Sequence, residues 1–194
     1  MINTKDDVRV LVVSASDKAY SVFHEFISDN TFTEMTRAVS IGEAKRLLLS
    51  YTYDIIIINA PLKDENGIDF AIDAVEDSPV GVIILISDEY YEQVSGEVSP
   101  YGVLTVSKPT NRQILYESAR LAVATNARLR KAEEQNAKLT AKMEEIRIVN
   151  HAKWLLIENL SISEEEAHKL IERQAMDTRR SKREIAETIL RTYN

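Results

Sequence analysis

The feature that most limits how this chain can fold is a long stretch without any helix-breaking residue, from Gln113 to Ile157. It contains neither glycine nor proline, so a helix that begins near Arg112 has no local reason to end. Before this stretch, strand-like apolar runs alternate with helical patterns, and after it the chain reads as short helices. The sequence therefore predicts an α/β domain joined by one long helix to a small, all-helical domain.

Five apolar, largely β-branched runs precede the long helix at intervals of roughly 20–25 residues, as in repeated βαβ units. Such runs are typical of strands that are buried on both faces, and right-handed crossovers between them would produce a parallel sheet. The predicted strands are Val8–Val13, Met35–Val39, Asp54–Ile58, Val80–Ile86 and Val103–Val106. The predicted helices between them include Lys18–Ile27, Ile41–Ser50 and Ile68–Val75. Sites in such sheets form beyond the carboxyl ends of the strands.

The strand order, the helix pattern and Lys108-Pro109 after the fifth strand resemble the receiver domain of bacterial response regulators, over about residues 6–124. In that family an aspartate at the end of the third strand accepts phosphate, and a loop glycine follows eight residues later. Asn59 and Gly67 have this spacing here. The resemblance assigns the remaining pocket positions as follows: the paired metal-binding acids to Ser14 and Ala15, the fourth-strand hydroxyl to Ser87, the loop lysine to Lys108 and the aromatic switch to Thr105.

These residues lack the chemistry of phosphorylation. Acyl-phosphate formation needs a carboxylate nucleophile, which an amide is not. Magnesium prefers carboxylate oxygens, and the side chains of Ser14 and Ala15 supply none. We therefore expect a pseudo-receiver with a degenerate phosphoacceptor pocket, in which Lys108 bonds Asn59 or loop carbonyls.

Two alternatives stay open for this pocket: Asp64 or Asp88 could act as a relocated acceptor, or an unknown ligand could occupy the vacated space. The chain has no cysteine and three scattered histidines, so thiolate and histidine metal sites are not expected. We expect no metal, no cofactor and no enzymatic activity.

The middle of the long helix carries an apolar repeat of 3.5 residues, which predicts a coiled coil over residues 125–147. An asparagine at an a-position is typical of a two-stranded register, so we expect a homodimer. The alternative is a solvated helix docked on its own domain. The predicted dimer interface consists of Leu129, Ala132, Asn136, Leu139, Met143 and Ile146.

The segment 148–194 resembles the ANTAR domain, the helical RNA-binding module of transcription antitermination regulators. The resemblance rests on Ile148–Leu156, Leu160–Ala167, Gln174–Met176 with Arg179–Ser181, and Ile185-Ala186. Ser163–Glu166 and Ser181–Glu184 read as capping boxes that open two of its helices, as Thr110–Gln113 does for the long helix. The resemblance implies binding of hairpin RNA in nascent transcripts by a dimer. The domain boundaries that we expect are 1–124 for the pseudo-receiver, 125–147 for the coiled-coil linker and 148–194 for the ANTAR-like domain.

Cationic side chains could form an RNA-binding patch where two helices of this domain meet: Lys153, Arg179, Arg180, Lys182 and Arg183. The alternative is that they are solvated and paired with Glu184 and Glu187. The family usually has a small residue after Lys153, where this chain has Trp154. That side chain could cap the small core or stack on a base.

The leading functional hypothesis is an RNA-binding transcription antitermination regulator of the response-regulator class. The alternative is a protein-interaction signalling module whose pseudo-receiver and coiled coil bind a protein partner, with no direct RNA function. DNA binding is less favoured, because no helix-turn-helix with a Gly-containing turn is evident. A protein or small molecule could regulate the input domain.

Composition agrees with a globular regulator: 44% of residues are hydrophobic and 28% charged, with a net charge of −7 concentrated before the long helix. No apolar run approaches the ~18 residues of a membrane span, and no basic segment precedes the first apolar run. We expect a cytoplasmic protein.

Overall fold

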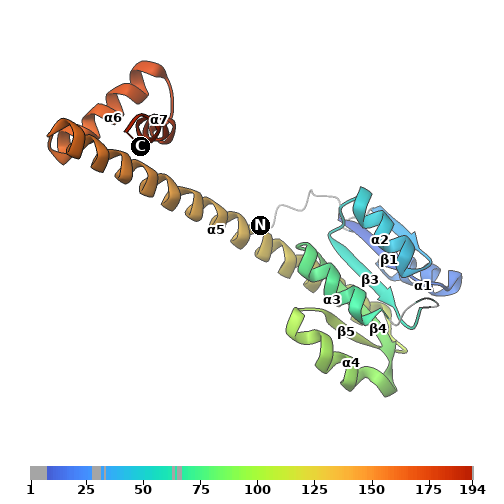
Figure 1. Ribbon diagram of the computed structural model, residues 1–194. Coiled ribbons are helices and arrows are strands. Elements are labelled where there is room, and N and C mark those ends of the chain that lie inside the picture. The colour runs from blue at the N-terminus through green and yellow to red at the C-terminus, as the bar shows by residue number, and fades with distance from the viewer. Residues whose placement is uncertain (1–7, 28–31, 33, 63, 65–66, 194) are drawn as a thin grey trace. The chain divides into compact units, whose positions relative to one another are not determined.

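The computed structural model describes residues 8–27, 32, 34–62, 64 and 67–193 (Figure 1). The chain divides into two compact units, one ending at Lys131 and one beginning at Ala132. A single 49-residue helix, α5 (Arg112–Leu160), contributes to both units. The long helix expected from the absence of glycine and proline is therefore present.

The first unit contains a five-stranded, fully parallel sheet with the strand order β2-β1-β3-β4-β5. Its strands are β1 (Arg9–Val13), β2 (Glu34–Ala38), β3 (Ile55–Asn59), β4 (Gly81–Ser87) and β5 (Leu104–Lys108). This is the flavodoxin-type order, whose ligand site lies beyond the carboxyl ends of the central strands. The fold class expected from the sequence is confirmed.

Helices cover both faces of this sheet, and the residues of β3 show how the two faces are separated. Ile56 and Ile58 pack in one cluster with α2 (Ile41–Ser50), α3 (Ile68–Asp77) and α4 (Tyr91–Val98). Ile55 and Ile57 pack in the other with α1 (Asp17–Ile27) and the start of α5. Successive strand residues face opposite ways, so a run of four isoleucines fills two cores at once. Two short 3₁₀ helices, η1 (Asp88–Tyr90) and η2 (Ser99–Tyr101), flank α4.

The beginning of α5 differs from the expected capping box at Thr110–Gln113. Asn111 is the residue before the helix, and its Oδ1 accepts a hydrogen bond of 2.9 Å from the backbone N–H of Ile114. Thr110 Oγ1 is buried and makes no hydrogen bond with any described residue. The cap is thus one residue later than the pattern indicated, because asparagine satisfies a free helix N–H as well as threonine does.

A glycine allows α5 to approach the sheet closely. A Cβ at Gly81, the first residue of β4, would lie 3.0 Å from Ala122 Cβ and 3.1 Å from the Ala122 carbonyl carbon. Real Cβ contacts are rarely this short, so α5 sits where only a hydrogen atom fits.

The second unit is a three-helix core made from the last turns of α5, α6 (Glu164–Thr178) and α7 (Lys182–Tyr193). Both expected capping boxes are formed. Ser163 Oγ accepts from the Glu166 N–H and Glu166 Oε2 accepts from the Ser163 N–H; Ser181 and Glu184 repeat the arrangement. The buried core consists of Ala152, Leu156, Ala167, Ile171, Ala175, Ile185, Ala186 and Ile189.

Of the helices in the described ranges, none combines the length and apolar character needed to cross a membrane.

Candidate functional site

At the carboxyl edge of the sheet, a chain of hydrogen bonds joins the ends of three strands. Lys108 Nζ, at the end of β5, donates to Asn59 Oδ1 at 3.1 Å and also to the carbonyl oxygen of Ala60. Asn59 Nδ2 donates in turn to Ser14 Oγ at 3.2 Å. These are the two kinds of acceptor, the amide and a loop carbonyl, that we expected for Lys108. The Ser14 hydroxyl donates its proton to the carbonyl oxygen of Ser16 at 3.3 Å and accepts from the Asn59 amide, a donor role that a carboxylate could not fill because it has no N–H.

The hydrogen bonds of this network are partly buried. Ser14 is fully buried, and burial lowers the pKa of the Lys108 ammonium below its ordinary range. A desolvated ammonium needs nearby oxygens, and it has them in Asn59 and Ala60.

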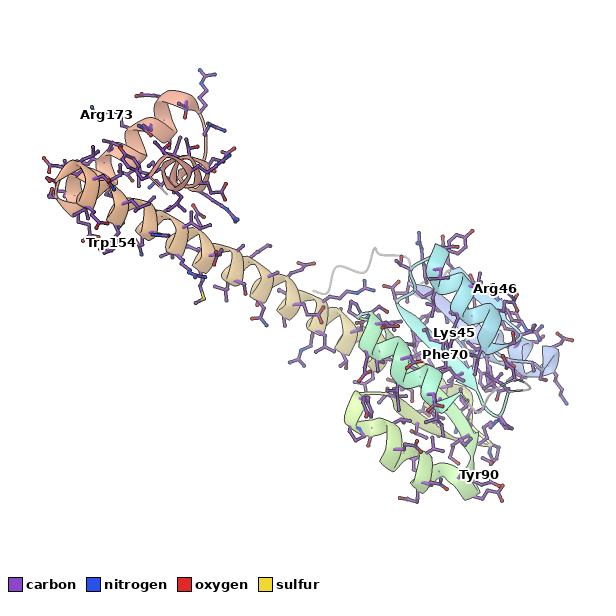
Figure 2. The ribbon with its side chains drawn as sticks, in the orientation of Figure 1. Lys45, Arg46, Phe70, Tyr90, Trp154 and Arg173 are labelled. Atoms are coloured by element: carbon purple, nitrogen blue, oxygen red, sulfur yellow. The ribbon has the colours of Figure 1, made fainter. Side chains whose placement is uncertain are left out.

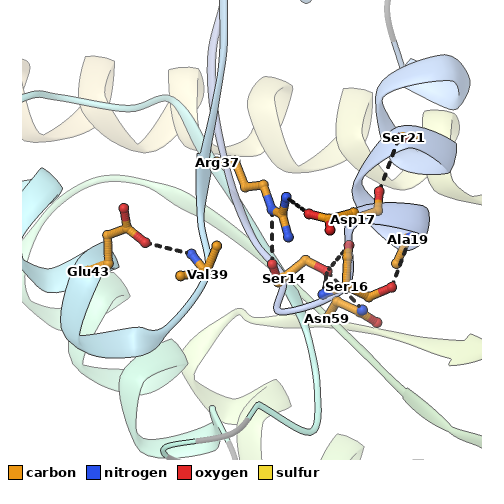
Figure 3. A network of polar contacts seen from close by, with 9 residues as sticks. All are labelled: Ser14, Ser16, Asp17, Ala19, Ser21, Arg37, Val39, Glu43 and Asn59. Carbon is orange, nitrogen blue, oxygen red and sulfur yellow. Dashed lines mark hydrogen bonds and ion pairs between the residues drawn. The ribbon is translucent and has the colours of Figure 1, made fainter.

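A second cation, Arg37, contacts the same network at Ser14 and was not expected from the sequence. Arg37, at the edge strand β2, donates from Nε to the carbonyl oxygen of Ser14 at 3.1 Å and from Nη1 to Asp17 (Figure 3). Its guanidinium also lies over the ring of Tyr20, 5.3 Å from the centroid. The sequence contains one signal for this contact, an arginine near the end of a predicted strand whose apolar pattern is weak.

This arrangement does not fit the magnesium that a receiver site implies. The oxygens at the end of β1 are the Ser14 hydroxyl and carbonyl, and the carbonyl already faces the Arg37 guanidinium. Ala15 offers no side-chain oxygen, and the carboxylate of Asp17 is paired with Arg37. A divalent cation there would meet a fixed positive charge and too few hard ligands.

The other predicted pocket residues lie nearby without joining this network. Ser87 is the register partner of Lys108 in the β4–β5 pair, but its hydroxyl bonds no residue that the structure describes. Asp88 accepts a 2.8 Å hydrogen bond from Ser107 Oγ. Asp64 accepts from the backbone N–H of Gly42 at 3.1 Å. Thr105 carries a buried hydroxyl with no partner among the described residues.

The predicted dimer interface is an exposed stripe on α5. Every residue from 131 to 144 is exposed, and Leu139 and Met143 keep 60% and 70% of their surface accessible. A helix with apolar side chains and nothing to bury them against is marginal in water by itself. The full set of expected interface residues is exposed: Leu129, Ala132, Asn136, Leu139, Met143 and Ile146.

In the second unit, three lysines line one hollow of about 250 Å³. Lys142 and Lys153 come from α5 and Lys182 from the first turn of α7. The rest of its lining is His168 of α6 and, from α5, Glu145, Ile146, Val149 and Asn150. The structure therefore brings together both of the predicted RNA-binding lysines, Lys153 and Lys182, and adds Lys142, which was not among the residues expected to bind RNA.

Several of the predicted RNA-binding cations are engaged with glutamates. Lys153 pairs with Glu164 at 2.9 Å and Lys182 with Glu172 at 2.6 Å. The hydrogen bond from Arg183 to Glu187 raises the pKa of that guanidinium further. The expected pairing partner Glu184 instead accepts the capping bonds of Ser181. The glutamates of these pairs are at least 38% exposed, as are the side chains of Lys182 and Arg183, whereas the Lys153 side chain is only 14% exposed. Ion pairs at such exposed positions contribute little, so a phosphate could replace the glutamate.

Arg179 and Arg180 occupy the turn between α6 and α7. Arg179 adopts a left-handed conformation, φ 54°, and ends α6 through its backbone N–H. Both side chains are exposed, and neither makes an ion pair with a residue in the described part of the chain.

Trp154 does not cap the small core. It is 62% exposed and lies on the side of α5 that faces away from α6 and α7 (Figure 2). Ala152 and Leu156 are buried on the side of α5 that faces the core. Trp154 is about half a helical turn away from each of them. Its indole is free for a base or for another protein chain.

Comparison with known proteins places this geometry in context. Residues 137–190 match the ANTAR domain model, a match that begins within the segment read as a coiled coil. The chain is 26% identical over 184 residues to the transcriptional regulatory protein PdtaR of Mycobacterium tuberculosis, in two strains, covering 95% of this chain and 90% of the relative.

Solved structures resemble the first unit. The signal receiver domain of an HD domain-containing protein from Pseudomonas fluorescens Pf-5 has a TM-score of 0.60 at 18% identity, covering 68% of this chain and 97% of that one. The chemotaxis response regulator CheY4 of Vibrio cholerae has a TM-score of 0.52 at 20% identity, covering 60% and 99%. At these identities the likeness establishes a receiver-like fold.

Proposed function

This chain belongs to the response regulators that carry an ANTAR domain, a family of transcription antitermination regulators, and from that premise we propose that it binds hairpin RNA as a homodimer. The RNA-binding surface comprises the lysine-lined hollow and the arginines of the α6–α7 turn. The input domain lacks the phosphoacceptor aspartate and acts by binding rather than by catalysis.

The observation that carries the proposal is the convergence of Lys142, Lys153 and Lys182 on one hollow. Three ammonium groups around a concave surface suit a phosphodiester backbone, which supplies most of the affinity in such complexes. Arg179 and Arg180 add two exposed guanidinium groups on the same unit. Hairpin loops also present unstacked bases, for which an exposed indole is a fitting partner.

The hollow borders the proposed dimer seam, because Ile146 belongs to both. A dimer formed along α5 would therefore carry a lysine-lined hollow on each copy, beside the shared helix pair. Such a dimer is suited to an RNA with two hairpins.

The decisive experiment titrates the full chain with a two-hairpin RNA at several salt concentrations. Replacing Arg179 and Arg180 with alanine should weaken binding, and replacing Lys142 and Lys182 with glutamine should lower the salt slope by about 1 per lost phosphate contact. A matched control is Lys169→Gln with Arg173→Gln, which removes the same charge from α6; Figure 2 shows Arg173 on the outer side of that helix. Specific RNA binding at this surface would be refuted if the control variant lost as much RNA affinity as the other variants, or if RNA affinity did not change with salt concentration.

The exposed stripe on α5 favours one other function, a protein-interaction module in which the stripe and the input domain hold a protein partner. It predicts that both double variants leave activity in cells unchanged, whereas a charge in the stripe abolishes it.

A further inference from the structure

A cavity of about 790 Å³ lies in the first unit, at the end of the sheet opposite to the Asn59–Lys108 network. It is walled by the end of α2, the loop that leads into β3, the later turns of α3 and Pro79. Asp54, which lines it, immediately precedes β3, whereas Asn59 ends that strand. The volume is in the range of small-molecule sites, which run from about 300 to 1,000 Å³.

The cavity has an apolar floor and a charged rim. Tyr53, Phe70 and Ala74 are buried at its base, with 7%, 2% and 5% of their surface exposed. Leu48 and the exposed ring of Tyr51 extend this apolar surface towards the mouth. Such a floor is suited to a ring rather than to a highly polar ligand.

Two carboxylates stand on one side of the rim. Asp73 and Asp77 are one turn apart on α3, so they lie on the same face of that helix. Lys45 stands on the α2 side; Figure 2 labels it together with Phe70. Within the described part of the chain, none of these three charged side chains has a hydrogen bond or an ion pair. Unpaired carboxylates over an apolar floor attract a cation that carries its own hydrophobic body.

The cavity touches the contact that fastens α5 to this end of the sheet. Arg130 lines it, pairs with Asp54 at 3.2 Å and donates from Nε to the carbonyl oxygen of Pro79 at 3.2 Å. Asp54 also accepts from the backbone N–H of Arg9 at 3.0 Å, and Asn126 of α5 donates to the Asp54 carbonyl oxygen at 3.4 Å. A ligand here would lie against the residues that hold α5 as it leaves the sheet.

We propose that this cavity binds a small aromatic or alicyclic amine, with the ammonium group between Asp73 and Asp77 and the ring against Tyr51 and Phe70. The ligand supplies an input to the first unit that does not require the carboxyl edge, where Asn59 and Arg37 replace the phosphorylation site. Because the bound ligand contacts Arg130, ligand binding in the cavity and the Asp54–Arg130 ion pair influence each other. The site goes beyond RNA binding and does not depend on it.

The test uses the full chain, labelled with ¹⁵N, and a panel of tryptamine, tyramine, phenethylamine and cyclohexylamine. At least one amine should shift the amide signals of Tyr51, Phe70 and Arg130 in a saturable manner, whereas indole-3-propionate, which carries a carboxylate in place of the amine, should not. Asp73→Asn with Asp77→Asn should weaken amine binding about tenfold. The matched control, Asp69→Asn with Glu76→Gln, removes the same charge elsewhere on α3 and should leave it unchanged.

Three outcomes would overturn the proposal: no member of the panel perturbs these signals up to millimolar concentration, the carboxylate analogue binds as well as the amines, or the Asp73 and Asp77 variant binds like its control. Binding of an amphipathic peptide across the same residues in place of every amine would assign the cavity to a protein partner and would equally refute a small-molecule site.

Discussion

Lys108 Nζ lies 3.1 Å from Asn59 Oδ1, so an amide accepts the hydrogen bond of the lysine at the centre of the carboxyl edge. The Nδ2 group of the same amide donates a hydrogen bond to Ser14 Oγ. A carboxylate at this position could accept from Lys108 but could not donate to Ser14, so the asparagine completes the network rather than merely omitting a charge. Lys108, Asn59 and Ser14 therefore form one continuous chain of hydrogen bonds between protein groups.

The first prediction concerns Asn59→Asp. The variant regains a nucleophilic oxygen, but Ser14 and Ala15 still offer no metal-binding carboxylate and Arg37 still faces the end of β1. We expect neither the wild type nor this variant to gain mass with acetyl phosphate and magnesium, as measured by intact-protein mass spectrometry. A phosphoryl adduct on the wild type would show that another side chain, such as Asp64 or Asp88, accepts phosphate.

The second prediction compares two glycines. Gly81→Ala places a methyl group 3.0 Å from Ala122 Cβ and should destabilise the first unit by about 1–3 kcal/mol through overpacking against α5. Gly96→Ala is the matched control, because nothing lies within 4 Å of a Cβ there and the residue is inside α4. It should stabilise by about 0.5–1 kcal/mol, since alanine loses less entropy in a helix. Urea denaturation should show a lower free energy of unfolding than the wild type for Gly81→Ala and a higher one for Gly96→Ala.

The fold could be read from the sequence because its signals are local and mutually consistent. The run of isoleucines in β3 predicts a strand buried on both faces, and Ile55 to Ile58 are all fully buried. The absence of glycine and proline after Arg112 predicts a helix, and α5 runs to Leu160. Serine followed by glutamate three residues later predicts helix starts at Ser163 and Ser181, and both capping boxes form.

The candidate sites were only partly readable, because their geometry depends on tertiary contacts. The role of Arg37 requires β2 to pair with β1, which brings it beside Ser14 although 23 positions separate them. Lys142 joins the hollow only because α7 returns to α5 and places Lys182 there. The exposure of Trp154 depends on which face of α5 receives α6 and α7, which the local sequence does not specify.

The third prediction tests the dimer. Leu139→Asp puts a charge into the proposed seam, where an unpaired buried carboxylate is costly, and should shift the protein to monomer in sedimentation velocity. Ala141→Asp is the matched control, because residue 141 lies on the opposite side of α5 and is also exposed in the single chain. Dissociation by both substitutions, or by neither, would contradict a seam at Leu139.

The fourth prediction separates two uses of Trp154. Since this side chain is 62% exposed, Trp154→Ala should leave the melting temperature nearly unchanged. If the indole stacks on a base of the bound RNA, the variant should lose about 1–3 kcal/mol of binding free energy in a fluorescence-anisotropy titration with labelled RNA. Trp154→Phe should recover part of that loss. A variant that instead dissociates in sedimentation, with unchanged RNA affinity per dimer, would assign the indole to the dimer seam.

The fifth prediction is a pH dependence that originates in the capping boxes of the second unit. Hydrogen bonds from the backbone and side chain of Ser163 lower the pKa of Glu166, and those from Ser181 lower the pKa of Glu184. A carboxyl whose folded pKa lies below its unfolded pKa stabilises the fold at a pH above the unfolded value, about 4.3, and loses this contribution as the pH falls through the folded value. The melting temperature followed by far-UV circular dichroism should therefore fall as the pH is lowered from about 4.5 towards 3.

The control for this prediction is the double variant Glu166→Gln with Glu184→Gln, which retains an acceptor at each capping box but has no carboxylate to protonate there. Its melting temperature should depend less on pH than that of the wild type. Parallel pH profiles for the two proteins would mean that other carboxylates, such as Glu164 and Glu172 in their lysine pairs, dominate the acid sensitivity.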